Sequence, residues 1–316
     1  RLLQSARFLS RLVGFLLLSV ILIPDQGWLT GSYHALFYSI SAFNNAGFAL
    51  TSESLVPKAG HWPLALVLGS LAVIGGLGFT VLAELRLRTR WSAMSLHSRL
   101  MLSGTAILLL FTFVVFLLCE WSNPATLGSY DTSEKLANGF FNAIVPRSAG
   151  FNMVDIGSLT LAVTMLYIVL MFIGAGTNSS GGGIKVTTFM VLILSTRAFL
   201  SGRTTPSVFG RSIPLELVLK SLAMAFIAMM IVLVTLFALT LTDPHLGFLN
   251  LFFEAVSACA TVGLSRGITG DLSEPGRIVL ILAMFVGRIG PLKLVFLLAK
   301  PKRNRIRYPA GDVHIG

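Results

Sequence analysis

Charged residues and cysteine are both scarce in this chain of 316 residues. Asp, Glu, Lys and Arg make up 12% of it, whereas hydrophobic residues make up 54%. Soluble domains average roughly 25% charged residues, so this composition excludes an ordinary soluble protein and indicates a polytopic membrane protein. The two cysteines, Cys119 and Cys259, lie in apolar stretches and are too few to form a disulfide framework.

The chain also lacks the residue patterns of metal sites and nucleotide-binding enzymes. Its five histidines are scattered without the spacing of metal ligands. No Gly-x-Gly-x-x-Gly motif follows a strand pattern, and no P-loop lysine motif occurs, so we expect no nucleotide on this chain. An intramembrane enzyme using the serines near residue 180 would need a histidine or an acid within reach, and the neighbouring spans contain no histidine. That class remains only a remote alternative, and we expect no catalytic residue.

Positive charge is concentrated in a few segments. The net charge is +11, and sixteen of the 24 Lys and Arg residues fall in segments 1–11, 86–99, 197–220 and 300–307. The positive-inside rule predicts that these segments are cytoplasmic. Most acids, among them Glu120 and Asp243, are then expected on the outer side, where they could raise the local cation concentration. For each acid singly, solvent exposure in an outer loop with no further role explains its position at least as well.

One pattern occurs three times along the chain: an apolar span, a shorter amphipathic segment, a glycine turn and a second span. We expect units over 1–90, 91–200 and 201–300, followed by a cytoplasmic tail over 301–316. In the first unit we expect a helix over 8–23, a polar turn over 24–32, a short segment over 33–43 and a span over 64–85. In the later units we expect a cytoplasmic loop over 195–211 and a last span over 278–298. Because each element is placed by the other copies, the repeat supports the assignment.

The three glycine turns follow segments of about eleven residues, which are too short to cross a bilayer. A short helix that ends at mid-depth directs the negative end of its dipole there, which suits a cation. Backbone carbonyls beyond it can replace an ion's hydration shell, and glycine permits the backbone conformation this needs. The polar residue of each turn could face the ion or bond neighbouring backbone, and a simple re-entrant bend is the alternative for each. The candidate ion-binding residues are Asn45, Ala46, Gly47, Ser148, Ala149, Gly150, Thr261, Val262 and Gly263.

The last span of the second unit is interrupted over 170–186 by five glycines, an asparagine and a lysine. Unwound backbone at membrane depth survives only where it is buried in protein or lines a watery cavity. The interruption therefore predicts an intramembrane loop on a permeation path. The alternative is a Gly/Ser-rich linker between two helices.

The motifs over 43–48, 147–152, 180–188, 261–265 and 287–292 resemble the Trk/Ktr/HKT superfamily of potassium transporters, most closely its KtrB-type membrane subunits. The resemblance implies an all-α polytopic membrane protein with pseudo-fourfold repeats of helix, pore helix, filter loop and helix. Three of the four repeats are found here, which implies an N-terminally truncated chain. Two departures are the loop sequence over 178–183 and Lys293, where the family usually has a small polar residue.

The resemblance implies potassium uptake as the ion-translocating subunit of a Ktr-type system, with sodium stimulation as an option. A Trk-type subunit and a sodium-selective relative are the alternatives. Potassium would bind only at filter carbonyls, beside which Arg147 would brace its turn, and the loop would act as a gate beneath the filter. Lys185 could instead snorkel to the cytoplasmic face. The implied gate residues are Gly174, Gly176, Ser180, Gly181, Gly182, Gly183, Lys185 and Arg288.

The resemblance also implies partners. KtrB-type subunits form a homodimer on a cytosolic KtrA-type ring, whose RCK domains bind nucleotide, in the bacterial inner membrane. The basic segments 86–99, 197–211 and 300–307 are candidate docking surfaces for such a ring, and anionic membrane lipids would explain the same charges equally well.

Overall fold

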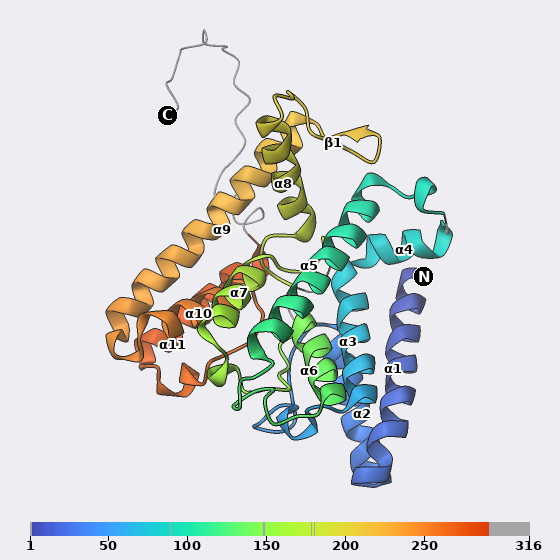
Figure 1. The fold of residues 1–316 in the computed structure, drawn as a ribbon, viewed down its shortest axis with the longest axis vertical. Coiled ribbons are helices and arrows are strands. Elements are labelled where there is room, and N and C mark those ends of the chain that lie inside the picture. The colour runs from blue at the N-terminus through green and yellow to red at the C-terminus, as the bar shows by residue number, and fades with distance from the viewer. Residues whose placement is uncertain (1, 89, 148, 178, 180, 291–316) are drawn as a thin grey trace.

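The computed structural model describes every residue except 1, 89, 148, 178, 180 and 291–316 (Figure 1). Over the described residues the regular secondary structure is helical apart from one small hairpin and an isolated bridge, which confirms the all-α fold class expected from the sequence. The helices are α1 (Leu2–Gln26), α2 (Trp28–Phe43), α3 (Trp62–Leu77), α4 (Phe79–Leu87), α5 (Leu96–Glu120), α6 (Thr132–Ile144), α7 (Leu161–Phe172), α8 (Val186–Leu200), α9 (Leu215–Thr242), α10 (Phe248–Cys259) and α11 (Glu274–Ile289).

Several helices have the length and composition of membrane spans. Within the described part of the chain, Phe8–Gln26 of α1, the whole of α5 and the whole of α9 meet this criterion. Helices α3 and α4 meet it only together, and they are bent by 96° at the break between them. Because α7, α8 and α10 are apolar but shorter, the fold combines full spans with helices that reach only part of the way across a bilayer.

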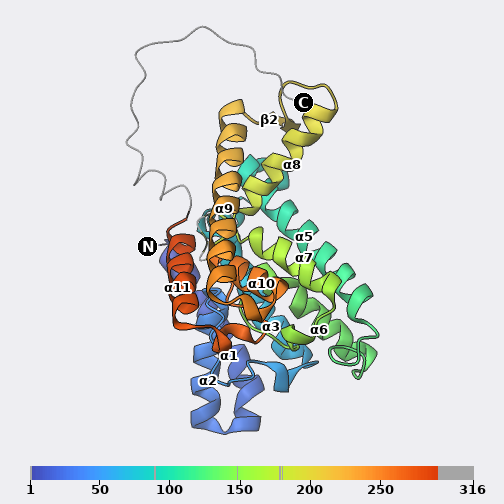
Figure 2. The same cartoon turned by 90° about the vertical axis from the view of Figure 1, so that its left-hand side faces the viewer.

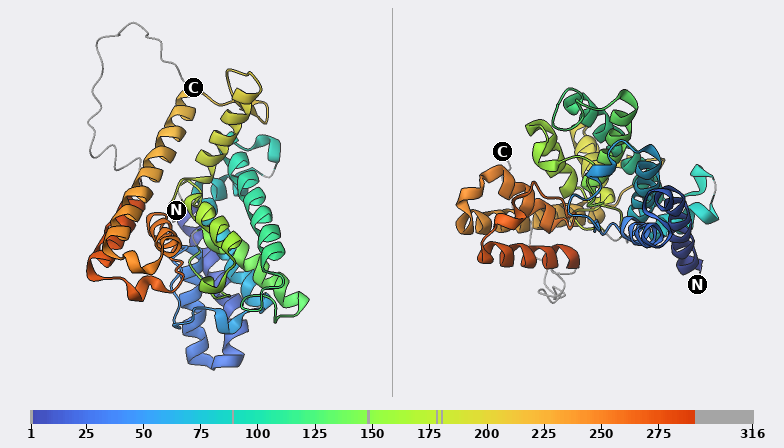
Figure 3. Two further views of the ribbon diagram at one scale, coloured as in Figure 1. Left: turned by 60° about the vertical axis from the view of Figure 1, so that its left-hand side comes forward. Right: turned by 90° about the horizontal axis from the view of Figure 1, so that it is seen from below.

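The helices form three groups that lie side by side: α1–α4, α5–α8 and α9–α11. Each group holds one short helix of 12 to 16 residues that is followed by a predicted glycine turn: α2, α6 or α10 (Figure 1). Seen from below, the three groups surround a central region that contains the loops after the short helices (Figure 3, right). This arrangement brings segments from distant parts of the sequence to one place.

Other connecting segments lie at two opposite ends of the molecule (Figure 1). The segment between α4 and α5 and the one between α8 and α9 lie at the upper end in Figure 1, where α8 and α9 also project in Figure 2. The upper end carries a small antiparallel hairpin, β1 (Ser207–Val208) and β2 (Arg211–Ser212), whose turn residues Phe209 and Gly210 are left-handed. Phe209 packs edge-on against Trp91, with ring centroids 5.9 Å apart, so the two basic loops contact each other.

The structure corrects several expected boundaries. The predicted polar turn over 24–32 is wrong, because α1 continues through Pro24 to Gln26 and only Gly27 separates it from α2. Gly31 permits this tight corner, since a Cβ there would lie 2.7 Å from the Cα of Ile23. The single span predicted over 64–85 is broken at Gly78, whose φ of 85° ends α3.

The loop predicted after α8 is shorter than expected. Helix α8 extends to Leu200, where a loop over 195–211 was predicted, and the hairpin occupies the end of that loop. The last span was predicted over 278–298. Helix α11 begins earlier, at Glu274, because Ser273 caps it and Pro275 occupies its first turn. Residues 291–298, with Lys293, and the tail 301–316 lie outside the described residues.

Candidate functional site: converging turns above an intramembrane loop

Helices α2 and α10 end in the same backbone motif, directly before the predicted ion-binding glycines. In each, a left-handed residue, Asn45 (φ 49°) or Thr261 (φ 53°), follows the last helical turn. Two hydrogen bonds close each helix end, a pattern known as the Schellman motif. They run from Asn45 N to Ala42 O (3.0 Å) and Ala46 N to Ser41 O (2.9 Å), and from Thr261 N to Ala258 O (3.1 Å) and Val262 N to Ser257 O (3.0 Å). The two turns thus share one local backbone structure, although their sequences differ at the left-handed residue.

The turn after α6 reaches a similar position by another route. A short 3₁₀ turn, Val145–Arg147, follows the helix, and Ala149 N donates to Val145 O (3.2 Å). Gly150 then takes a left-handed φ of 73°, as Gly47 does at 70° and Gly263 at 86°. The predicted residue Ser148 lies outside the described residues.

The three turns meet at the centre of the molecule. A Cβ built on Gly47 would lie 2.5 Å from the Cα of Gly150, and one on Gly150 would lie 2.8 Å from the carbonyl oxygen of Val262. Such distances leave no space for a side chain, so the close approach of the first two turns requires glycine in both. Around Gly263 no atom lies within 4 Å of the corresponding position. The structure therefore brings together residues that are about 100 and 200 positions apart in the sequence.

Asn45 directs its side chain at α3. In the amide orientation that satisfies both groups, Nδ2 donates to Ala72 O and Oδ1 accepts from Gly76 N, each at 3.2 Å. An uninterrupted α-helix pairs these two backbone groups with each other, so the side chain inserts near the break at Gly78. Of the two roles open to Asn45 from the sequence, this geometry fits bonding to neighbouring backbone.

Arg147 lies behind the turns in a small cavity. Its side chain is buried, and Nη2 lies 3.5 Å from Oγ1 of Thr105 on α5, whereas Nε has no hydrogen-bond partner. The cavity, of about 20 Å³, is also lined by Asn45, Gly76 and Ala175. Arg147 thus contacts α5 and shares a cavity with another turn and with the intramembrane loop.

The predicted intramembrane loop is non-helical between Phe172 and Val186. A parallel bridge between Ile173 and Ile184 closes its neck, with hydrogen bonds from Ile184 N to Phe172 O (3.0 Å) and from Val186 N to Ala175 O (3.4 Å). These bonds satisfy backbone groups that a broken helix leaves unpaired. The predicted loop residue Ser180 lies outside the described residues.

The loop contacts two of the groups around it. Gly176 N donates to Gly76 O of α3 (2.8 Å). A Cβ on Gly182 would lie 2.5 Å from both the carbonyl oxygen of Ala260 and Oγ1 of Thr261. Gly174 and Gly183 pack backbone to backbone across the neck. The loop therefore lies directly against the turn after α10.

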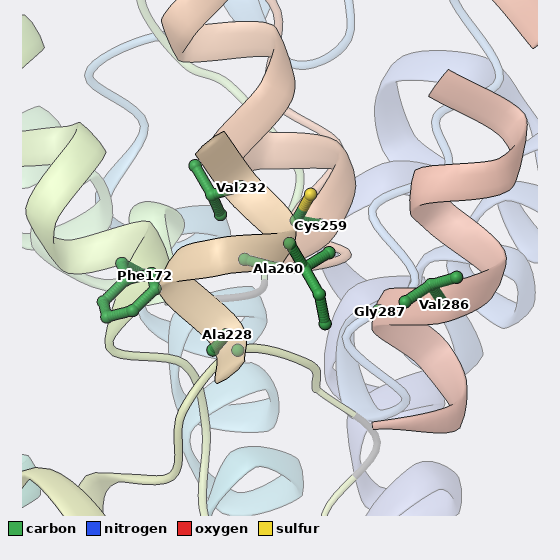
Figure 4. Close-up of a pocket in the computed structure, with 9 residues that line it drawn as sticks. Phe172, Ala228, Val232, Cys259, Ala260, Val286 and Gly287 are labelled. Atoms are coloured by element: carbon green, nitrogen blue, oxygen red, sulfur yellow. The ribbon is translucent and has the colours of Figure 1, made fainter. Parts of the chain in front are cut away.

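The two cations predicted at the loop lie near each other. Lys185 is partly buried and its Nζ donates to Gly181 O (2.5 Å), within the loop itself. Arg288 on α11 is close enough for its charge to interact with that of Lys185. Helix α11 approaches through Gly287, since any Cβ there would overlap the carbonyl oxygen of Cys259. An apolar cavity of about 20 Å³ lies where α7, α9, α10 and α11 meet (Figure 4). Cys259 and Ala260 lie in the middle of this group, with Phe172, Ala228 and Val232 on one side and Val286 and Gly287 on the other.

Two buried acids correct the expectation that the outer acids are solvent-exposed. Glu120 and Asp243 have no exposed surface. Glu120 accepts hydrogen bonds from Asn123 Nδ2 (2.7 Å), Thr126 Oγ1 (2.6 Å) and both the amide (2.9 Å) and hydroxyl (2.6 Å) of Thr160. Buried charges of this kind are tolerated when they are fully hydrogen-bonded, so both acids hold helix ends together.

Two further polar residues near the last turn were missed in the sequence. Glu254, in the short helix α10, is 5% exposed and accepts hydrogen bonds from Ser265 Oγ and Thr269 Oγ1. Arg266, just after Gly263, donates to residues of three other segments. A charged residue inside a short apolar helix is the signal that could have identified Glu254. No local pattern identifies Arg266, because its partners are distant in sequence.

Together these features define a class of protein: a multi-pass, all-helical membrane protein in which short helices end in glycine turns that converge next to an intramembrane loop. A family model described as "TrkH: Cation transport protein" matches residues 3–306, almost the whole chain. The chain therefore belongs to the TrkH cation transport family.

Individual relatives agree with this assignment. Ktr system potassium uptake protein B of Bacillus subtilis is 43% identical over 305 residues, covering 96% of this chain and 68% of the relative. The protein of the same name from Vibrio alginolyticus is 42% identical, with coverage of 96% and 67%. Potassium/sodium uptake protein NtpJ of Enterococcus hirae is 36% identical, with coverage of 97% and 69%.

A solved structure has the same fold. The potassium transporter TrkH from Vibrio parahaemolyticus superposes with a TM-score of 0.69, at 20% sequence identity, covering 94% of this chain and 72% of the other. At this identity the likeness concerns the fold alone.

Proposed function

We propose that this chain takes up potassium ions across the bacterial inner membrane, as the ion-translocating subunit of a Ktr-type system. Two relatives above 40% identity are named as potassium uptake proteins of the Ktr system. The observation that carries the proposal is the convergence of three glycine turns at one point, each at the end of a short helix. The chain is a transporter rather than an enzyme, as its relatives are.

In this proposal the turns coordinate the ion. The C-terminal ends of α2, α6 and α10 carry the negative ends of their helix dipoles to the turns, which favours a cation there. Carbonyl oxygens then replace the water that a potassium ion loses on entry. The residues assigned to this filter are Asn45, Ala46, Gly47, Ser148, Ala149, Gly150, Thr261, Val262 and Gly263.

The intramembrane loop acts as the gate. It lies against Thr261 of the turn after α10 on one side and against Gly76 of α3 on the other, so a change in the loop is felt at that turn and at α3. Lys185 and Arg288 place positive charge beside a cation path, and conduction requires these charges to be satisfied or displaced. The gate residues are Gly174, Gly176, Ser180, Gly181, Gly182, Gly183, Lys185 and Arg288.

We further propose the assembly that Ktr-system names suggest. Two copies form a homodimer, and a cytosolic ring of KtrA type with nucleotide-binding domains docks on the basic end that carries segment 86–99 and the hairpin, with anionic lipids around it. Within the chain, residues 1–90, 91–200 and 201–300 each form one pore unit.

Uptake of Rb⁺, a tracer for K⁺, tests the filter. Cells that lack their own potassium uptake systems would express the full-length protein with its cytosolic partner. Gly263→Ser should raise the KM for Rb⁺ about tenfold, because a side chain at φ 86° costs about 1 to 2 kcal/mol and displaces the carbonyls.

Gly270→Ser is the matched control, since this exposed glycine lies in the same outer segment with open space around it. Equal KM values for both variants would mean that Gly263 is an ordinary bend.

Sodium is the second candidate ion, because one relative is named a potassium/sodium uptake protein. If ²²Na⁺ uptake matched Rb⁺ uptake in rate and affinity, the protein would transport both sodium and potassium rather than select potassium.

A further inference from the structure

Arg266 joins three separate segments on the outer side of the molecule. Its Nε donates to Oδ1 of Asn250 on α10 (2.9 Å), and its Nη2 donates to the carbonyl oxygen of Gly157 (3.1 Å), in the loop before α7. Its Nη1 donates to Oγ1 of Thr164 in the first turns of α7. The planar guanidinium suits three acceptors in fixed directions, which a lysine ammonium on a flexible stem does not.

The hydrogen bonds continue from Arg266 into the fold. Thr164 is fully buried and donates to Thr160 O (3.0 Å), and Thr160 donates to the buried carboxylate of Glu120 at the end of α5. Arg266 is therefore one end of a chain of bonds that reaches the second group of helices. A connected network of this kind holds its members more firmly than separate pairs do.

The position of Arg266 gives this network a role in transport. Residues 261–264 form the turn after α10, and Arg266 fixes the segment that leaves it. Helix α7, to which Arg266 is bound at one end, leads at its other end into the intramembrane loop. Arg266 thus ties the last turn to the helix that carries the loop.

We propose that Arg266 is a positioning residue, which holds the turn 261–264 in register with α7 and thereby sets the affinity for the transported cation. The inference rests on the proposed function, in which this turn coordinates the ion. It makes a prediction opposite to that of simple electrostatics. Removing a positive charge from the outer side should attract cations and lower KM, whereas releasing the turn should raise it.

Rb⁺ uptake by the full-length protein with its cytosolic partner separates the two effects. Arg266→Gln should raise KM about tenfold, as expected when bonds to a charged group are lost, with a smaller change in the maximal rate. Arg266→Lys should retain part of the affinity. The control is Arg277→Gln, which removes an equal charge from an exposed side chain. Among the described residues, the side chain of Arg277 hydrogen-bonds only the carbonyl oxygen of Gly270 in the same outer segment, to which Nη2 donates (2.7 Å). The KM of this variant should stay unchanged or fall.

Thr164→Val provides a second route, because it removes one acceptor and keeps the shape of the side chain. It should raise KM less than Arg266→Gln does, and the double variant should be no worse than Arg266→Gln alone. If Arg266→Gln does not reach the membrane, an unchanged KM in Thr164→Val overturns the proposal. An Arg266→Gln protein whose KM is unchanged, or lowered like that of Arg277→Gln, also overturns it.

Gly263→Ser, measured in parallel, separates this inference from the proposed function. A raised KM for Gly263→Ser with a normal KM for Arg266→Gln would leave the filter in place and reject only the role of Arg266. Normal KM values for both variants would reject the filter assignment itself.

Discussion

Asn45 and Thr261 occupy equivalent left-handed positions at the ends of α2 and α10, but their side chains have different surroundings. Asn45 tolerates this conformation well and bonds the backbone of α3. Thr261 is β-branched, so the same conformation is strained, and its buried Oγ1 has no hydrogen-bond partner. That hydroxyl lies against Gly182 of the intramembrane loop. Strain is thus stored where the turn meets the loop.

Asp243 is a residue whose charge should matter for stability. Burial alone would raise the pKa of this carboxyl, but the hydroxyl of Thr242 and the amide and hydroxyl of Ser273 donate to it and lower its pKa below 3.8. A lowered pKa in the folded state means that the carboxylate stabilises the protein above the unfolded pKa of 3.8, and that this stability is lost as the pH falls through the folded pKa.

Asp243→Asn should therefore lower the Tm of the purified protein at pH 7 by about 2 to 8 °C. The difference from the unsubstituted protein should shrink once the pH falls below the unfolded value of 3.8. Asp271→Asn, an exposed acid in the same outer region, should leave Tm unchanged at both pH values. A Tm difference for Asp243→Asn that persists at low pH would show that the carboxylate charge is not the cause.

Sequence reasoning located the glycines of the site but not the residues that hold them. Gly47, Gly150 and Gly263 follow from a repeated local pattern, which one chain displays three times. The partners of Arg266 lie 16, 102 and 109 residues away, so no local window contains them. Glu120 was expected among the outer, solvated acids, because a sequence gives the side of the membrane but not the depth at which a carboxylate is covered.

At the scale of elements, two adjacent glycines of α3 should respond differently to the same substitution. A Cβ on Gly75 would overlap the carbonyl oxygen of Phe43 at the end of α2, whereas a Cβ on Gly76 would have its nearest neighbour at 3.7 Å. Gly75→Ala should destabilise the protein by about 2 kcal/mol or more, because α2 must move away.

Gly76→Ala should be neutral or more stable by up to about 1 kcal/mol, since alanine favours the helix. Thermal unfolding in detergent, followed by circular dichroism, measures both. Equal decreases in stability for the two variants would show that Gly75 does not make a close contact with the end of α2.

Helix types were more predictable than helix ends. Long apolar runs identify α5 and α9 because hydrophobicity continues for more than a bilayer's thickness. The end of α1 was misjudged because Pro24 was taken as the start of a turn, although a proline in the last helical turn does not have to end it. The break at Gly78 was missed because the three other glycines of the predicted span are helical, and no local pattern marks Gly78 as the one that takes a left-handed φ of 85°.

At the scale of the whole molecule, the arrangement of loops predicts which residues face the cytoplasm. Thr205, in the segment between α8 and α9, and Asp271, in the segment between α10 and α11, are both exposed. The two segments lie toward opposite ends of the molecule (Figure 1). In a protein whose two native cysteines are replaced by serine, an impermeant maleimide added to intact cells should label Asp271→Cys and spare Thr205→Cys. Lysed cells should show labelling of both. The reverse pattern in intact cells would invert the proposed orientation.

The neck of the intramembrane loop has a mechanical consequence. Ile173 and Ile184 pair side by side and close the loop into a ring, and one backbone hydrogen bond joins Ile184 to Phe172 at the end of α7 while a second joins Val186 at the start of α8 to Ala175. A pull on α8 from its C-terminal end at Leu200 would load these two bonds in shear before any force reached the ring. Helices α7 and α8 would then move together as one rigid unit. The ring could extend only after these two hydrogen bonds had broken.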